Sequence, residues 1–266
     1  MRVRSVLLTA AAAALVVYFA AGPGALHSQT NGPALAGQVS SAEEGNMEGV
    51  LVTAKRTGSV INITVVSDNK GNFAFPRTKL EPGAYTLKTR AVGYDLDDPG
   101  TIEVTPDKSA SVALKLHKTA NLAAQLTNSE WLRSMPADDK EKDFLLNCVQ
   151  CHTLERILRS KHTEEEFMKV MQRMGSYANQ SFPLHIQKRM ATRLLEVRGE
   201  ELQRTRERMA KLMAANNLSN GPSWPYQFKT NPRPKGTNTH VIVTEYDLPR
   251  KIIEPHDVIL DRDGQV

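Results

Sequence analysis

The residues Cys148-Val149-Gln150-Cys151-His152 lie near the middle of this 266-residue chain and contain both of its cysteines. Two thiols separated by two residues and followed directly by a histidine are the attachment pattern of a covalently bound c-type haem. The thiols add to the haem vinyl groups, and His152 becomes an axial ligand of the iron. We expect one turn of helix to carry all three groups, so the motif predicts one covalent haem c.

Other uses of the Cys-x-x-Cys spacing agree less well with the surrounding sequence. A thioredoxin-type redox pair follows a strand, whereas residues 138–143 are charged and favour a helix. A structural zinc site normally needs four Cys or His ligands in two clusters, and the chain has only two cysteines. A structural disulfide between Cys148 and Cys151 stays open, although it leaves His152 unexplained.

Residues 1–28 have the order of a secretory signal peptide. Arg2 and Arg4 precede an apolar run from Val6 to Ala21, which small residues follow. The run is shorter than the roughly 20 residues that span a bilayer comfortably. We therefore expect cleavage near Ala25 to Ser28, and an uncleaved segment would be the chain's membrane contact. The signal predicts a periplasmic or secreted bacterial protein, which agrees with haem attachment after export.

The composition is that of an ordinary soluble protein, with 40% hydrophobic and 24% charged residues. The length allows about two domains after the signal is removed. The net charge of +5 is mildly basic, and the signal's own arginines contribute to it. This charge does not indicate a nucleic-acid partner, and it fits an acidic redox partner or a membrane surface equally well.

Residues 34–118 carry short runs in which apolar and polar residues alternate, which is the period of a half-buried strand. Gly, Pro, Asn and Asp punctuate these runs, as in Asp68-Asn69-Lys70-Gly71 and Glu81-Pro82-Gly83. Short strands with turn signals between them predict an all-β sandwich. The expected strands are residues 36–40, 50–54, 61–66, 72–75, 84–89, 101–104 and 111–116.

Four stretches of this segment occur in a recognisable succession: Gly49-Val50-Leu51-Val52-Thr53-Ala54, Ser67-Asp68-Asn69-Lys70-Gly71-Asn72-Phe73-Ala74-Phe75, Leu80-Glu81-Pro82-Gly83-Ala84-Tyr85-Thr86-Leu87 and Gly93-Tyr94. The succession resembles the carboxypeptidase regulatory-like domain over nearly the whole segment. The resemblance implies a small transthyretin-like sandwich without catalytic apparatus. Such domains usually have structural or adhesive roles, or bind carbohydrate or protein.

Residues 138–217 are predicted to be helical and to hold the haem. Lys142 to Ser160 is expected to form one helix that contains the attachment motif. Thr163 and Glu166 form a capping box that begins a second helix, and a third is expected from Leu184 or Ile186 to Ala215. A haem motif set among three helices resembles the small c-type cytochromes. The resemblance implies an all-α cytochrome c-like domain.

The sixth iron ligand is predicted to be Met174. A methionine sulfur commonly lies opposite the proximal histidine in cytochromes c, and Met174 stands directly before Gly175, where the chain turns. The run from Phe167 to Met174 also resembles the segment after the attachment motif in some haem domains of multi-domain dehydrogenases. The alternatives are Met171, Met190, and a bis-histidine site that uses His162 or His185.

The C-terminal part is predicted to be a linker followed by two strands. Residues 218–238 are rich in Pro, Gly, Asn and Ser and predict an extended linker. Residues 239–266 resemble the opening of the first blade of a β-propeller of the streptogramin lyase (virginiamycin B lyase) type. A propeller needs several four-stranded blades. The resemblance therefore implies a partial blade, a truncated propeller start, with the lyase's catalytic residues beyond Val266.

The sequence predicts an exported electron carrier with one covalent haem and an accessory β-sandwich for docking or spacing. It does not identify the redox partner protein, and no catalytic residue is assigned. Two other functions stay open. The chain would be the N-terminal part of a streptogramin lyase-like propeller enzyme whose catalytic part is missing, or a carbohydrate-binding or protein-binding protein led by the sandwich.

Overall fold

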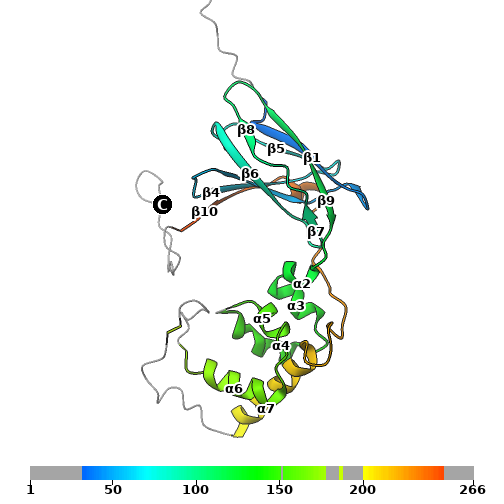
Figure 1. The fold of residues 1–266 in the computed structure, drawn as a ribbon, viewed down its shortest axis with the longest axis vertical. Helices are drawn as coiled ribbons and strands as arrows, with labels where there is room; N and C mark the ends of the chain where they lie inside the picture. The colour runs from blue at the N-terminus through cyan, green and yellow to red at the C-terminus, as the bar shows by residue number, and fades with distance from the viewer. Residues whose placement is uncertain (1–31, 151, 178–185, 188–199, 249–266) are drawn as a thin grey trace, which may run out of the picture.

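The computed structural model describes residues 32–150, 152–177, 186–187 and 200–248. The predicted signal peptide and the predicted second strand of the propeller blade lie outside these residues. In Figure 1 the described chain forms a two-sheet β part, a cluster of short helices, and a last strand that returns to the β part.

Within the described residues, ten strands form two five-stranded sheets. One sheet has the order β2-β1-β9-β7, with β5 also paired to β1, and the other has the order β10-β4-β3-β6-β8. The strands are Leu35–Ser41 (β1), Gly45–Asn46 (β2), Leu51–Arg56 (β3), Ile61–Val66 (β4), Asn72–Phe75 (β5), Gly83–Arg90 (β6), Tyr94–Leu96 (β7), Ile102–Val104 (β8), Ala110–Lys118 (β9) and Ile242–Tyr246 (β10). The all-β prediction for the N-terminal part is confirmed.

The core of the sandwich follows from the alternation in its strands. Along β5, Asn72 and Ala74 are exposed, whereas Phe73 and Phe75 are buried. On β6, Tyr85 and Leu87 point into the same core. Because successive side chains of a strand point to opposite faces, the apolar positions of both sheets meet between them. This burial is the main stabilising contribution to the sandwich.

The predicted turn at Asp68 to Gly71 is confirmed. The Oδ1 atom of Asp68 accepts hydrogen bonds from the backbone N–H groups of Lys70 and Asn72, each at 2.8 Å. Gly71 has a φ of +76°, and a Cβ at this position would lie 2.5 Å from the carbonyl oxygen of Val39. Only glycine fits this close approach of two backbone segments.

The helical part consists of short helices around a second apolar core. They are α2 (Leu122–Gln125), α3 (Asn128–Ser134), α4 (Asp139–Leu146), the 3₁₀ turn η1 (Cys148–Gln150), α5 (Leu154–Leu158), α6 (Glu164–Met174) and α7 (Glu200–Asn216). The predicted capping box of Thr163 and Glu166 is present at the start of α6, and α4 begins with another, formed by Asp138 and Glu141.

The prediction of one helix from Lys142 to Ser160 is wrong. Helix α4 ends at Leu146, and the carbonyl oxygen of Phe144 accepts both the backbone N–H and the Nδ2 group of Asn147, each at 3.2 Å. The 3₁₀ turn η1 follows α4, and extended backbone at Thr153 precedes α5. The attachment motif therefore lies between two helices, with Cys148 in a 3₁₀ turn, and not on one continuous helical turn.

Residues 218–238, predicted to be an extended linker, pack against the helices instead. Trp224, Tyr226 and Phe228 pack against the core of the helices, and Trp224 lies 5.4 Å from Trp131, measured between ring centroids. Three aromatic side chains bury enough apolar surface to hold this segment against the helices. Proline and glycine content alone did not reveal this packing.

The first strand of the predicted propeller blade belongs to the sandwich. Strand β10 pairs antiparallel with β4, with Ile242 opposite Val65 and Tyr246 opposite Ile61. Figure 1 shows the segment after α7 returning along the helices to this sheet edge. An edge strand such as β4 would otherwise leave backbone N–H and C=O groups unpaired. Strand β10 pairs with these groups and becomes the edge strand of that sheet. This correction concerns residues 242–246, and residues 249–266 lie outside the described range.

Candidate haem attachment site

The attachment motif lies at the junction of α4 and α5. Cys148 begins η1 and is half-buried, and its side chain packs with Val149 against the helical core. His152 follows in the loop before α5 and is half-buried. Cys151 lies outside the described residues. Cys148 and Val149 thus lie against the helical core, and His152 follows them in the loop before α5.

The imidazole of His152 is held in one orientation. Its Nδ1 atom lies 3.1 Å from the carbonyl oxygen of Thr153. A carbonyl oxygen can only accept a hydrogen bond, so Nδ1 is the donor, which leaves Nε2 for another partner. This is the arrangement in which metal-binding histidines are usually held, with the other ring nitrogen donating to a carbonyl or a carboxylate. The donor set of the motif fits a haem iron.

Met174 is the last residue of α6, and its side chain is 39% exposed. Met168 and Met171, by contrast, are partly buried and pack against the helical core. Met171 is therefore used in packing and Met174 is exposed at the end of α6, and no contact places Met174 beside Cys148 or His152 among the described residues. Met190 and His185, two of the alternatives, lie outside the described residues.

His162, the remaining alternative, is engaged with α6. Its ring lies edge-on to Phe167 at 5.4 Å between centroids, and its Nδ1 atom is 3.7 Å from a carboxylate oxygen of Glu166. The pKa of Glu166 is lowered, first by the backbone hydrogen bond from Thr163 and also by the nearby His162. His162 therefore helps to begin α6, and a role as iron ligand would cost these contacts.

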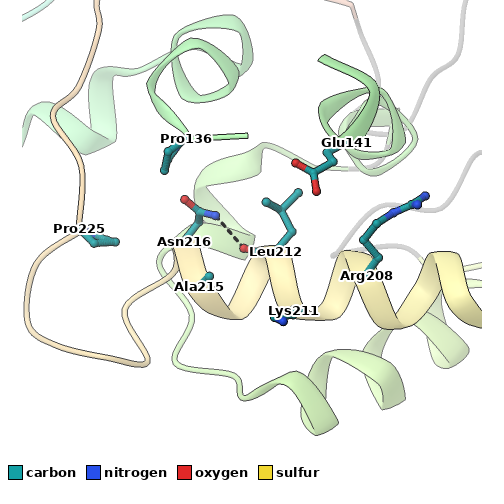
Figure 2. A pocket seen from close by; sticks show the side chains of 8 residues that line it. All are labelled: Pro136, Glu141, Arg208, Lys211, Leu212, Ala215, Asn216 and Pro225. Atoms are coloured by element: carbon teal, nitrogen blue, oxygen red, sulfur yellow. Dashed lines mark hydrogen bonds between the residues drawn. The ribbon is translucent and has the colours of Figure 1, made fainter. Parts of the chain in front are cut away.

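A cavity of about 590 Å³ lies between α4, α7 and the segment after α7 (Figure 2). Asn216 lines it, donates from Nδ2 to the carbonyl oxygen of Leu212 at 2.8 Å, and has an Oδ1 atom without a partner among the described residues. None of Cys148, His152 and Met174 lines this cavity. Its lining residues are Pro136, Glu141, Arg208, Lys211, Leu212, Ala215, Asn216 and Pro225.

The segment after α7 ties the motif's helices to the sandwich. The Nε1 group of Trp224 donates to the carbonyl oxygen of Leu158, the last residue of α5, at 2.8 Å. Further along, the guanidinium of Arg233 bonds the carboxylate of Glu44, and the N–H of Gly236 donates to Glu48 at 2.8 Å. These contacts connect the helix that follows His152 with the β part.

Glu130 is the buried anchor of this segment. Its side chain is 1% exposed and accepts hydrogen bonds from the backbone N–H groups of Thr127 at 2.8 Å and Asn231 at 2.7 Å. Burial by itself would raise its pKa, but these bonds, with the nearby Arg90, outweigh burial and lower the pKa below the ordinary value of 4.5. The carboxylate is therefore charged in the folded protein.

We expect the replacement Glu130→Gln to lower the free energy of unfolding at pH 7 by about 2 kcal/mol, since charge-assisted bonds to two buried N–H groups are weakened. Because the folded pKa lies below 4.5, the stabilisation by Glu130 is present above that pH and is lost as the pH falls through the folded pKa. Urea unfolding of the purified protein between pH 7 and 3 measures both effects.

The control for this prediction is Glu43→Gln, which changes an exposed carboxylate of the sandwich. It should leave both the stability and its acid dependence nearly unchanged. If Glu130→Gln loses as much stability at pH 3 as at pH 7, the proposed role of the charged carboxylate is wrong.

A model of the Carboxypeptidase regulatory-like domain matches residues 34–117. Residues 34–117 are a carboxypeptidase regulatory-like domain. The match agrees with the predicted segment, and it assigns the regulatory-like domain to strands β1 to β9. Strand β10 extends one sheet of this domain from a position more than a hundred residues later in the chain.

The search of curated proteins found no match. Among solved structures, the Bacillus anthracis TIE protein is 21% identical over 32% of this chain, with a TM-score of 0.26. The aligned part spans 16% of the length of that chain. This similarity adds nothing to the assignment of the regulatory-like domain.

In the described part of the chain, no helix combines the length and apolar character needed to cross a membrane. Residues 32–150, 152–177, 186–187 and 200–248 also contain no group of three His, Cys, Asp or Glu side chains that would hold a metal ion. A haem iron does not require such a group, because the porphyrin supplies the equatorial ligands.

Proposed function

We propose that the chain is an exported c-type cytochrome module that carries electrons on one covalent haem. Cys148 and Cys151 would hold the haem through thioether bonds, and His152 would bind its iron through Nε2. The observation that carries the proposal is the hydrogen bond from His152 Nδ1 to the carbonyl oxygen of Thr153, which leaves Nε2 as the ligand atom. When bound, the haem would supply an iron that cycles between ferric and ferrous forms.

The protein's own contribution is orientation and burial. The core beneath Cys148 and Val149 would cover one side of the attachment turn, and it includes the buried Leu145 and Leu154. Burial and axial ligation are the means by which a protein sets the potential of a haem iron. Electron transfer itself requires no bond to the substrate, so no catalytic residue is needed.

The regulatory-like domain would act as an accessory that docks or spaces the haem module, with carbohydrate or protein as its ligand. The contacts of Arg233 with Glu44 and of Gly236 with Glu48 support a fixed attachment of the two parts. The redox partner would be another exported protein.

The test is to express the full chain together with haem-maturation proteins in an exporting bacterium. The purified protein should be coloured, should stain for haem after denaturing electrophoresis, and should have the mass of the polypeptide plus one haem. Purified protein with bare polypeptide mass, obtained alongside a correctly matured reference cytochrome, would rule out the proposed function.

The sixth ligand is tested by replacing methionines one at a time with leucine, which keeps the side-chain volume. Met174→Leu should remove the sulfur-to-iron charge-transfer band of the ferric protein and lower the midpoint potential, because methionine ligation raises it. Met171→Leu, the matched control on the same helix, should keep both. The assignment to Met174 is wrong if Met174→Leu keeps the band and the potential.

A further inference from the structure

One peptide group beside the haem motif is hydrogen-bonded at both of its ends. The carbonyl oxygen of Thr153 accepts from His152 Nδ1 at 3.1 Å. The N–H of Leu154, which belongs to the same peptide plane, donates to the Oδ1 atom of Asn128 at 2.9 Å. A continuous path of two hydrogen bonds thus joins the imidazole of His152 to the side chain of Asn128.

Asn128 supplies a cap that the local sequence lacks. Thr153 occupies the N-cap position of α5 but makes no side-chain cap hydrogen bond. The first N–H group of α5 is bonded instead by Asn128, the first residue of α3. That end of α3 is itself held by the capping box of Thr127 and Glu130. Asn128 therefore holds the peptide from a fixed position.

We infer that Asn128 is a positioning residue for the iron ligand His152, acting through the peptide group between Thr153 and Leu154. The inference rests on the proposed function. A peptide whose N–H is bonded is a stronger acceptor at its carbonyl, because hydrogen bonds in a chain polarise one another. The carbonyl then fixes the ring of His152 and raises the basicity of Nε2, as partners of metal-binding histidines do.

The basicity of the His152 imidazole would affect the midpoint potential of the iron. A more basic imidazole donates more electron density and favours the ferric form. Loss of the hydrogen bond to Asn128 should therefore raise the midpoint potential and weaken the hydrogen bond from His152 Nδ1 to the carbonyl oxygen of Thr153. We expect Asn128→Ala to speed exchange of the Nδ1 hydrogen with solvent by about 1.2- to 2-fold, because one hydrogen bond in a chain strengthens its neighbour by about 10–30% and a neutral hydrogen bond contributes roughly 1 kcal/mol.

The experiment compares holoproteins carrying Asn128→Ala, Asn128→Asp and Asn121→Ala by redox titration and by proton NMR of the His152 ring. Asn128→Asp keeps the acceptor and should keep slow exchange, with a midpoint potential below that of the wild type, because a carboxylate is a stronger acceptor than an amide oxygen. Asn121→Ala removes a cap of α2 that does not touch this peptide group, so it controls for general loosening of the helices and should behave as the wild type.

A wild-type potential and exchange rate in Asn128→Ala, or the same changes in Asn128→Asp and Asn121→Ala, would overturn the role of Asn128. If Asn128→Ala does not fold, the comparison of Asn128→Asp with the wild type decides, since a carboxylate acceptor should lower the potential. Absence of covalent haem from the wild-type chain would instead refute the proposed function, so the two failures are distinguishable.

Discussion

Replacement of both Cys148 and Cys151 by alanine should abolish covalent haem, and Cys148→Ala alone should lose most of the haem stain. In the proposed function each thiol would supply one thioether bond, and the motif at the junction of α4 and α5 contains both cysteines of the chain. His152→Ala should remove the proposed iron ligand and change the spectrum of any haem that still attaches. Haem-stained gels and intact mass, normalised to the amount of exported polypeptide, measure the loss.

The matched control is Val149→Ala, which trims a side chain between the cysteines and keeps their spacing. This variant should retain the haem stain and the added mass of one haem, because Val149 is only partly buried against the helical core. An equal loss of haem in Val149→Ala would attribute the effect to folding of η1. Unchanged haem mass in the double cysteine variant would contradict thioether attachment at these residues.

Trp131→Ala should destabilise the purified protein by roughly 3–5 kcal/mol, the usual cost of removing a large aromatic side chain from a core. Trp131 is fully buried, and its ring lies 5.4 Å from Trp224 and 5.1 Å from Phe228, measured between centroids. Its loss would leave a cavity beneath the segment that joins α7 to β10. Urea unfolding followed by far-ultraviolet circular dichroism measures the change.

Trp131→Phe separates packing from hydrogen bonding. The Nε1 group of Trp131 has no hydrogen-bond partner among the described residues, so replacing the indole by a phenyl ring removes an unsatisfied buried donor. We expect this variant to lose less than about 1.5 kcal/mol, as core substitutions that nearly conserve volume do. Equal losses in Trp131→Phe and Trp131→Ala would show that the indole shape, and not aromatic packing in general, holds the segment.

Local patterns predicted the elements that depend on neighbouring residues. The alternation in residues 72–75 predicted β5, and Thr163 with Glu166 predicted the start of α6. The Asp68 turn followed from short-range hydrogen bonding in the same way. The break in the expected helix was missed, because Asn147 and Thr153 are both tolerated in helices; Asn147 keeps helical backbone angles, and the extended backbone at Thr153 separates η1 from α5.

Contacts between distant residues were not predictable from such patterns. The same alternation predicts a strand at residues 242–246 whether its partner is a propeller blade or β4, and only the fold places it at the sandwich edge. Asn128 has no sequence signal for a link to His152, because its bond to Leu154 spans 26 residues. Trp224 and Phe228 looked like parts of a linker until their contacts with Trp131 were known.

The sequence by itself determined the regulatory-like sandwich at residues 34–117 and the thiols and imidazole of the proposed haem site, because both depend on residue types at short, regular spacing. Only the tertiary structure decided which ring nitrogen of His152 is left for a ligand, which distant side chain holds its peptide, and which sheet β10 joins. These depend on hydrogen bonds and packing between residues far apart in the chain, whose geometry is set when the whole core forms.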